Sequence, residues 1–584
     1  MNKQEKIIAL LLGLALAGWL WHSVDVQKER AAQGAPAAVA AEASRAPAPA
    51  KPAAAESRPA EEKKAPARVQ APERLETLGN GEVELTLSTR GATIKAAKML
   101  KYAQRPGAVS DANPALVFDF SDAPALALEG VAGLEPDADF SVVGRGRDFV
   151  VFRNEALERR ITLRDGYRIQ VEETFAKPAA GAENFLSLGA LSMGSSNNDI
   201  LSVDSLALAG GKPRVVHHGD DGDSPLRDHL VSLSGGCGGR QDAHGRPERV
   251  VRDYPGAQAW IAMKNRFFVA ALASCTVPNE GFRATMRRDM ARPDYALRNV
   301  SVAPRFAGVP AARAYTLYLG PKKQALLWDL GMRDVMEFGM WRWLCYPLVW
   351  VLNVFNSWIP NYGVAIILLT ILVRLLFWPL THKSTMGMRR MQEIQPKVKA
   401  LQARFKDNPQ RLQQEIWQVY RENKVNPLSS CLPMLLQIPV FIALFNVLRA
   451  AVELRYAPFL WIADLSEPEA LFAGWFPFGG LNVLPILMAA LTMLQSLFTP
   501  SGGDNRQQRM MMVMMPLFML FMFYNFPSAL SLYWALSTAF SVLQSWWIRR
   551  KYGTPAAARR DGVVVPDAVE MPVTRQMRRH ARES

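Results

Sequence analysis

The chain has 584 residues and carries 68 Lys or Arg against 53 Asp or Glu, a formal net charge of +15 at pH 7. This length allows several domains, and because the basic residues gather in a few segments the positive charge requires no DNA-binding domain. The Walker sequence GxxxxGK[ST] is absent from the sequence, which excludes a P-loop ATPase.

The N-terminal region predicts a membrane anchor followed by a tether. Residues 1–24 hold a short basic start and an apolar run at 7–21, which is typical of a signal peptide or a signal anchor. Ala-x-Ala sequences beyond Arg30 leave cleavage open, and we favour an uncleaved transmembrane anchor. Residues 25–72 are rich in Ala and Pro and lack large apolar side chains, which predicts a disordered linker.

Residues 73–328 predict one large antiparallel β domain, a β-sandwich. Short runs of alternating apolar and polar residues, such as those at 83–88 and 167–175, are separated by Gly, Asp and Pro clusters. Cys237 and Cys275 both fall in this domain, and their spacing leaves open whether they form a disulfide.

The remainder of the chain predicts a helical membrane domain. Residues 329–352 mix apolar, Trp and charged residues, which indicates an amphipathic helix at the membrane surface. Residues 353–550 predict a core of five spans, and the N-terminal anchor brings the total to six. The five core spans are expected near 361–381, 432–450, 482–499, 511–526 and 529–547. Residues 551–584 form a basic tail.

Charges between the predicted spans indicate their orientation. Residues 382–430 hold ten Lys or Arg against four acidic residues, whereas 451–481 holds four acidic residues against Arg455 alone. Because loops rich in Lys and Arg stay in the cytoplasm, we expect both termini and the 382–430 segment to be cytoplasmic. The β domain and the 451–481 loop are then expected outside.

Arg374 is the candidate functional centre. It lies inside the span at 361–381, and no predicted span contains a carboxylate that could pair with it. An unpaired guanidinium inside a bilayer costs at least about 2.5–3.5 kcal/mol, so such a residue usually marks a function. Water or neutral groups must solvate it, which predicts a polar recess, and Thr370 shares its helix face one turn earlier. The competing interpretation is that Arg374 extends to the headgroups.

The segment 384–424 predicts a cytoplasmic helical hairpin. Apolar residues recur at three-to-four spacing through its first half, and the sequence KDNP at 406–409 interrupts the pattern before a second helix. Such a charged hairpin could receive an incoming chain or simply cap the bundle.

Several sequence blocks, in a fixed order, resemble one known family. The blocks are YLGPK at 318–322, NYGVAII at 361–367 with Thr370 and Arg374, MQEIQPK at 391–397, VNPL at 425–428, CLPMLLQIP at 431–439, Met515-Pro516, NFP at 525–527 and LYW at 532–534. Over about 75–550 the chain is similar to the YidC/Oxa/Alb membrane insertases, in the Gram-negative form with a large periplasmic domain. Ser429-Ser430 and Ser528-Ala529-Leu530 replace the family's Gly-Gly and Ser-Gly-Leu, which bears on local turns.

The resemblance implies a membrane protein insertase and chaperone of the bacterial inner membrane, not an enzyme, with no cofactor and no metal. It implies a hydrophilic groove, open to cytoplasm and lipid, that is lined by Thr370, Arg374, Gln495 and Trp534. Nascent membrane proteins are the implied substrates, and the implied partners are membrane lipids and the Sec translocon (SecYEG and SecDF).

Ribosomes and the signal recognition particle receptor are also implied partners, through the hairpin and the tail. The candidate contact residues are Met391, Gln395, Pro396 and Lys397 in the hairpin segment and Arg575, Arg578, Arg579 and Arg582 in the tail.

Two other classes of function compete with this interpretation. A secondary transporter would also need a polar recess, but ion coupling usually uses Asp, Glu or His inside the membrane, and these spans contain none. A membrane-tethered enzyme acting on sugars would use the β domain. Its candidate residues form one Gly-rich segment, His217, His218, Asp220, Asp221 and Asp223, for which a solvated loop is the commoner interpretation.

Overall fold

The structure is a computed structural model. It describes residues 72–192, 201–208, 214–218, 248–288, 297–406, 408–423, 425, 432–472, 480–498 and 505–552. The predicted N-terminal anchor, the linker up to residue 71, Cys237 and the tail from residue 553 lie outside the described residues.

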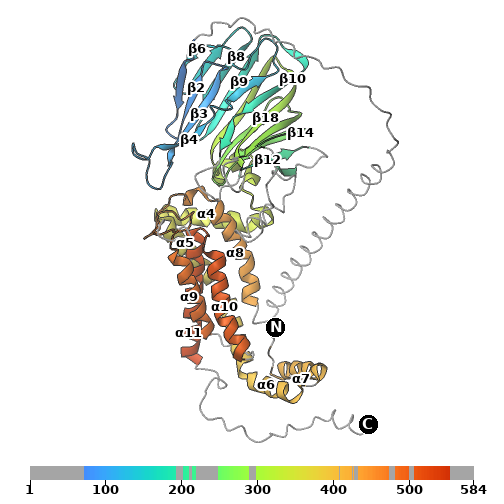
Figure 1. Ribbon diagram of the computed structural model, residues 1–584, viewed down its shortest axis with the longest axis vertical. Coiled ribbons are helices and arrows are strands. Elements are labelled where there is room, and N and C mark those ends of the chain that lie inside the picture. Colours follow the sequence, from blue (N-terminus) through green and yellow to red (C-terminus); the bar gives the residue numbers. More distant parts are fainter. Residues whose placement is uncertain are drawn as a thin grey trace, which may run out of the picture. The chain divides into compact units, whose positions relative to one another are not determined.

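Two antiparallel sheets form the β domain (Figure 1). The first sheet contains, in spatial order, β1 (Leu75–Gly79), β2 (Val83–Ser88), β3 (Thr93–Ala103), β5 (Ala125–Glu129), β10 (Ala179–Leu188), β18 (Leu297–Val309), β17 (Gly281–Arg288) and β14 (Arg249–Pro255), with β4 (Ala115–Asp119) beside β3 and β11 (Ala190–Ser192) beside β18. The second contains β13 (Arg214–His218), β12 (Ser202–Ala207), β15 (Gln258–Lys264), β16 (Phe268–Cys275), β19 (Ala312–Pro321), β9 (Arg168–Phe175), β8 (Leu157–Leu163), β7 (Phe149–Arg153) and β6 (Ser141–Arg145).

Alternating side chains bring the sheets together, because successive residues of a strand point to opposite faces. Ile169, Val171 and Phe175 of β9 are buried at alternate positions. Between the sheets, the ring of Tyr102 on β3 meets the ring of Phe268 on β16 edge-on, with centroids 5.3 Å apart. The predicted antiparallel sandwich is confirmed.

A buried ionic network also joins the two sheets. The Glu173 carboxylate accepts hydrogen bonds from Arg159 Nε at 2.9 Å and from Arg313 Nη2 at 2.6 Å, and all three side chains have no exposed surface. Arg159 Nη1 also donates to the Ala92 carbonyl at 2.9 Å, and Arg313 Nη1 donates to Asn184 Oδ1 on β10 at 3.1 Å. Burial raises the pKa of Glu173, but the two guanidinium groups outweigh it and the net pKa is lowered.

Short helices follow the β domain: α3 (Gln324–Asp329), η2 (Arg333–Met336), η3 (Gly339–Trp341) and then α4 (Arg342–Trp358). The prediction of one continuous amphipathic helix over 329–352 is therefore wrong. Gly331 and Glu337 adopt left-handed backbone angles, with φ of 68° and 56°, and these interrupt the helix twice. On α4, Trp343 and Trp350 are 66% and 64% exposed. The location of α4 at the membrane surface stays a prediction.

The other helices are α5 (Tyr362–Glu393), α6 (Gln395–Arg404), α7 (Pro409–Glu422), α8 (Leu432–Ala450), η5 (Val452–Leu454), α9 (Val483–Phe498), α10 (Asn505–Phe523) and α11 (Ser528–Tyr552) (Figure 1). Among the described residues α5 is long and apolar enough to cross a membrane, and shorter apolar stretches occupy Gln437–Ala450, Val483–Ser496 and Val513–Phe523. Large apolar side chains lie exposed along four of these helices: Leu375 and Leu376 on α5, Leu487 and Met493 on α9, Leu517 and Phe521 on α10, Leu543 and Trp546 on α11. Apolar surface of this extent is typical of helices that face lipid.

The hairpin segment differs from its prediction in one respect. α5 continues without a break to Glu393, so residues 384–393 extend the predicted span and do not form the first hairpin helix. The hairpin consists of α6 and α7, and Asn408 caps α7 by accepting a hydrogen bond from the Arg411 N–H at 3.1 Å.

Candidate functional site around Arg374

Arg374 bonds to neutral groups on another helix. Its Nη2 donates to both the carbonyl oxygen and the hydroxyl of Ser537 on α11. The guanidinium is half-buried, and Ser541 Oγ donates to the same Ser537 carbonyl at 3.1 Å. The sequence predicted neutral partners for Arg374, and the structure identifies Ser537 as that partner.

The polar contact extends to a third helix. Tyr533 lies one turn before Ser537 on α11 and interacts with the Ser537 side chain. Its hydroxyl accepts a hydrogen bond from Gln437 Nε2 on α8 at 2.8 Å. Arg374, Ser537, Tyr533 and Gln437 therefore connect α5, α11 and α8 by hydrogen-bonding groups inside an otherwise apolar bundle.

Polar contacts between α5 and α11 recur along both helices, and we call this row the polar seam. Its three contacts are Arg374 with Ser537, Gln544 Nε2 donating to Thr381 Oγ1 at 3.4 Å, and Arg389 Nη2 donating to the Tyr552 carbonyl. Along each helix the contacts are seven and then eight residues apart, which is about two helical turns. The two helices consequently run in the same direction with matched polar faces.

Two of the predicted groove residues have contacts of a different kind. Thr370 has no exposed surface, and its hydroxyl donates to the Ile366 carbonyl of the same helix at 2.7 Å. Trp534 packs on aromatic rings, with centroids 4.8 Å from Phe441 and 5.1 Å from Phe523. The Thr370 hydroxyl is thus hydrogen-bonded within its own helix, and Trp534 belongs to an aromatic cluster formed by α8, α10 and α11.

Gln495 is half-buried on α9, next to Met493 and Leu494, which are 49% and 40% exposed. α9 packs against α11 and α10. The membership of Gln495 in a groove with Arg374 stays a prediction.

The predicted partner-contact residues lie where α5 passes into the hairpin. Met391 is half-buried near the end of α5, and Gln395, Pro396 and Lys397 form the first turn of α6. Pro396 and Lys397 are exposed. The tail residues Arg575 to Arg582 lie outside the described residues.

Sequence reasoning missed Ser537 and Tyr533, and did not assign Gln437 to the site. Gln437 carried a usable signal, because it is a polar residue inside an apolar helix, where a side-chain amide needs a partner. Ser537 carried little signal of this kind, since α11 contains several serines and a serine hydroxyl can bond to a carbonyl of its own helix.

A second polar cluster joins the second sheet of the β domain to Glu337 at the end of η2. His217 Nδ1 is 2.8 Å from Asp204 Oδ1 and 3.7 Å from Glu337 Oε1. The donor atoms of these three residues lie within 4.8 Å of one another, which is close enough to hold a metal ion. The Lys264 ammonium, however, bonds to Asp204 and lies 2.6 Å from Glu337, so a buried side chain already supplies the positive charge. We therefore interpret the cluster as an ionic network.

The positions of two histidines correct a prediction. His217 and His218 do not lie in a loop but on β13, paired in register with Asp204 and Val203. Asp220, Asp221 and Asp223 lie outside the described residues.

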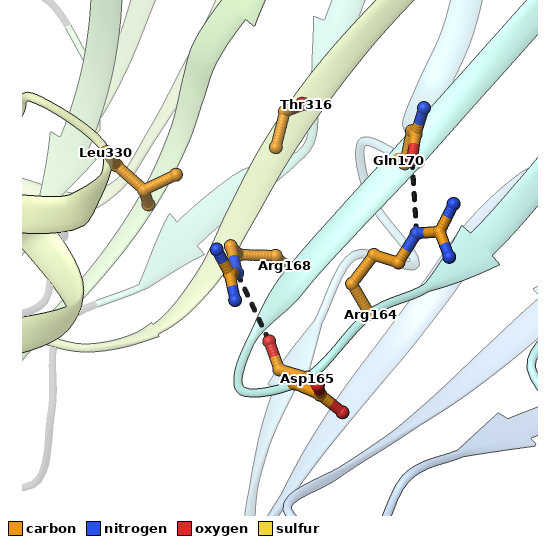
Figure 2. Close-up of a pocket in the computed structure, with 6 residues that line it drawn as sticks. All are labelled: Arg164, Asp165, Arg168, Gln170, Thr316 and Leu330. Atoms are coloured by element: carbon orange, nitrogen blue, oxygen red, sulfur yellow. Dashed lines mark hydrogen bonds between the residues drawn. The ribbon is translucent and has the colours of Figure 1, made fainter.

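One open hollow of about 340 Å³ lies on the β domain (Figure 2). It is lined by Arg164, Asp165, Arg168, Gln170, Thr316 and Leu330. Its arginines already have partners, since Arg164 Nε donates to Gln170 at 3.1 Å and Arg168 Nε to the Asp165 carbonyl at 3.2 Å.

Comparison with known proteins finds family models for the helical region and the β domain, and relatives that match longer parts of the chain. Residues 354–555 match the family model of the 60Kd inner membrane protein, and residues 245–351 match that of the YidC periplasmic domain. The chain is 30% identical over 499 residues to the membrane protein insertase YidC of Chloroherpeton thalassium, covering 82% of this chain and 83% of that protein. It is 40% identical to that of Syntrophobacter fumaroxidans, but there the match spans about half of each protein, 50% of this chain and 53% of the relative. A solved structure described as an active YidC insertase is 17% identical, with 81% of this chain and 95% of that chain covered and a TM-score of 0.35.

Proposed function

Because the chain belongs to the YidC family of membrane protein insertases, we propose that its polar seam receives the hydrophilic segment of a nascent membrane protein. This family is not an enzyme family. The observation that supports the proposal is the half-buried Arg374, held by neutral groups of Ser537 between helices whose other faces are apolar and exposed.

The seam would lower the cost of moving polar groups across the membrane. A hydrophilic tail that leaves water loses its hydrogen bonds, at about 1–3 kcal/mol for each unpaired group. The half-buried Arg374 offers a replacement partner, and it attracts carboxylates more strongly than it would in bulk water. The apolar segment of the substrate would meanwhile contact the exposed side chains of α9 and α10 and partition into lipid. The membrane potential adds to this for negatively charged segments.

We further propose the finer features of this function. The chain crosses the inner membrane six times, with both termini and the α6–α7 hairpin in the cytoplasm and the β domain in the periplasm, in line with the charges of 382–430 and 451–481. It works alone or beside the Sec translocon, and the hairpin and tail meet ribosomes and the signal recognition particle receptor. The domain limits predicted from the sequence, except those of the 329–352 helix and of the hairpin's first helix, belong to the same proposal, as do the groove residues Thr370, Gln495 and Trp534.

Charge reversal at Arg374 tests the proposal. Two substrates are compared that differ only in whether the translocated tail carries Asp or Asn, and their insertion into vesicles containing the purified chain is measured. We expect Arg374→Glu to reduce insertion of the Asp tail at least about tenfold more than insertion of the Asn tail, because a factor of ten is only about 1.4 kcal/mol of electrostatic difference. Arg374→Lys should retain part of the difference between the tails.

Arg404→Glu is the matched control, since it makes the same charge change on α6 of the hairpin. Equal losses for both tails with Arg374→Glu, or the same tail dependence with Arg404→Glu, would contradict an electrostatic role for Arg374.

A further inference from the structure

The 451–472 loop, which follows α8, contacts the first turns of both seam helices. At α11, Ser528 N and Oγ donate to the Glu467 carbonyl at 2.9 and 2.6 Å, and Ala529 N donates to the Leu465 carbonyl at 2.9 Å. At α5, the Phe459 ring lies so close that a Cβ added to Gly363 would be 2.1 Å from it. One loop thus contacts the starts of both α5 and α11.

The loop also has hydrogen bonds within itself. Asp464 Oδ1 accepts hydrogen bonds from Tyr456 N at 3.0 Å and from Ser466 N at 2.8 Å. Leu465 N donates to the Ala457 carbonyl at 3.1 Å. A displacement of the loop would therefore move the starts of both helices together with it.

The β domain holds the same loop through a buried arginine. Arg266 lies in the turn between β15 and β16 with only 5% of its side chain exposed. Its Nε donates to the Arg449 carbonyl at 2.9 Å, its Nη1 to Glu467 Oε1 at 2.6 Å and its Nη2 to the Ser466 carbonyl at 2.6 Å. A guanidinium can satisfy three acceptors in one plane, whereas a lysine ammonium is a point charge.

A second contact supports the first from another strand. Arg455 Nη1 donates to the Ala103 carbonyl at the end of β3 at 2.9 Å, and the Tyr456 hydroxyl donates to the Gln104 carbonyl at 2.7 Å. The loop is therefore bonded to both sheets of the β domain.

We infer that Arg266 is a positioning residue for the polar seam, and that this is one role of the β domain. Glu467 links Arg266 to α11, because its carboxylate accepts a hydrogen bond from Arg266 and its backbone carbonyl accepts one from Ser528 at the start of α11. Ser537 lies nine residues beyond Ser528, about 14 Å along a rigid helix. Arg266 thereby sets the position of α11 beside α5 at the point where Ser537 meets Arg374. The effect of this alignment on insertion rests on the proposed function. The alignment of α11 with α5 does not.

The test measures the seam and the activity separately in the full-length chain. Cysteines replace Thr381 and Gln544, whose side chains meet in the seam, and the native cysteines are replaced by serine or alanine. Oxidation then yields an α5–α11 disulfide whose extent reports how well the helices are aligned, whether or not the chain inserts substrates. Insertion into vesicles is measured on the same Arg266 variants without the added cysteines.

We expect Arg266→Ala to lower the disulfide yield, because α11 is no longer held beside α5. We expect insertion activity to fall about tenfold, which corresponds to about 1.4 kcal/mol. Arg266→Lys should fall between Arg266→Ala and the parent chain, and it covers the case in which Arg266→Ala does not fold. Arg283→Ala is the matched control, because Arg283 pairs with Asp253 at 2.9 Å within the β domain.

An unchanged disulfide yield in the Arg266 variants would overturn the inference whatever their insertion activity. A reduced yield with full insertion activity would overturn the consequence of this alignment for insertion. If the parent chain inserts no substrate, the proposed function fails, and the disulfide yield still decides whether Arg266 aligns the helices.

Discussion

Two buried charges in this chain are accommodated by different chemistry. Arg374 bonds to a hydroxyl and a carbonyl, whereas Glu173 is enclosed by two guanidinium groups. The sequence predicted the first, because a lone charge in an apolar run is conspicuous. It could not predict the second, since Glu173 occupies an inward position in the alternating pattern of β9 and its partners come from β8 and β19. A pattern along one strand does not reveal which side chains of neighbouring strands enclose it.

Neutralising Glu173 should destabilise the β domain severely. Glu173→Gln leaves Arg159 and Arg313 buried without an anion, and breaking such a pair costs about 3–5 kcal/mol. The lowered pKa of Glu173 also means that its contribution is present above the ordinary value of 4.5 and is lost as the pH falls through the folded value. Denaturant unfolding of the β domain, measured from neutral to acidic pH, should show a large loss at neutral pH and a weaker acid dependence in the variant.

Glu172→Gln provides the control, because Glu172 is exposed at the adjacent position on the same strand. Similar losses for the two substitutions would show that the buried network does not stabilise the fold.

At the scale of single elements, helical periodicity located the core helices but missed interruptions caused by distant residues. The region 329–352 has the composition of one helix, yet Glu337 takes a left-handed conformation. The Lys264 ammonium bonds to the Glu337 carboxylate from β15, a strand far earlier in the chain. Local sequence carries no information about such a partner, so the break could not be predicted.

The start of α5 offers a test of close packing. Gly363→Ala would ordinarily favour the helix by about 1 kcal/mol, but here the added Cβ would lie 2.1 Å from the Phe459 ring. Overpacking costs about 1–3 kcal/mol, so we expect a net loss of stability in thermal unfolding of the detergent-solubilised chain.

Phe459→Ala should remove most of that loss when the two substitutions are combined, which gives a strongly non-additive double-mutant cycle. Additive effects would show that the Phe459 ring does not restrict Gly363.

At the scale of the whole molecule, the sequence predicted a β-sandwich and a helical C-terminal region but not how they are joined. The joint consists of side chains that lie close together only after folding. Asp204, His217 and Lys264 of the second sheet meet Glu337, while Arg266 holds the 451–472 loop. Each of these residues is unremarkable in its own segment.

The stability of the joint between the β domain and the helices should depend on pH through His217. Burial lowers its pKa, but the hydrogen bond with Asp204 and the charges of Asp204 and Glu337 outweigh both burial and the repulsion from Lys264, so the net pKa is raised. The stabilisation is therefore complete below the ordinary value of about 6.5 and is lost as the pH rises through the higher folded value. Thermal unfolding of the full-length chain followed across this range should show the decline.

His217→Gln should remove this decline, because Gln keeps a hydrogen-bonding group but does not titrate. A variant with the same pH profile as the parent chain would rule out His217 as its source.

Under the proposed function, the neutral partners of Arg374 have a consequence for the sequences of the substrates. Hydroxyl and carbonyl groups solvate a guanidinium but do not cancel its charge, so the seam keeps a positive potential. If the seam receives nascent tails, as proposed, tails with Asp or Glu would be attracted to such a potential, whereas tails with Lys or Arg would be repelled and would stay on the side from which they came. The seam would then select substrates by the sign of their charge. The translocated tails of its substrates should therefore contain few Lys or Arg residues.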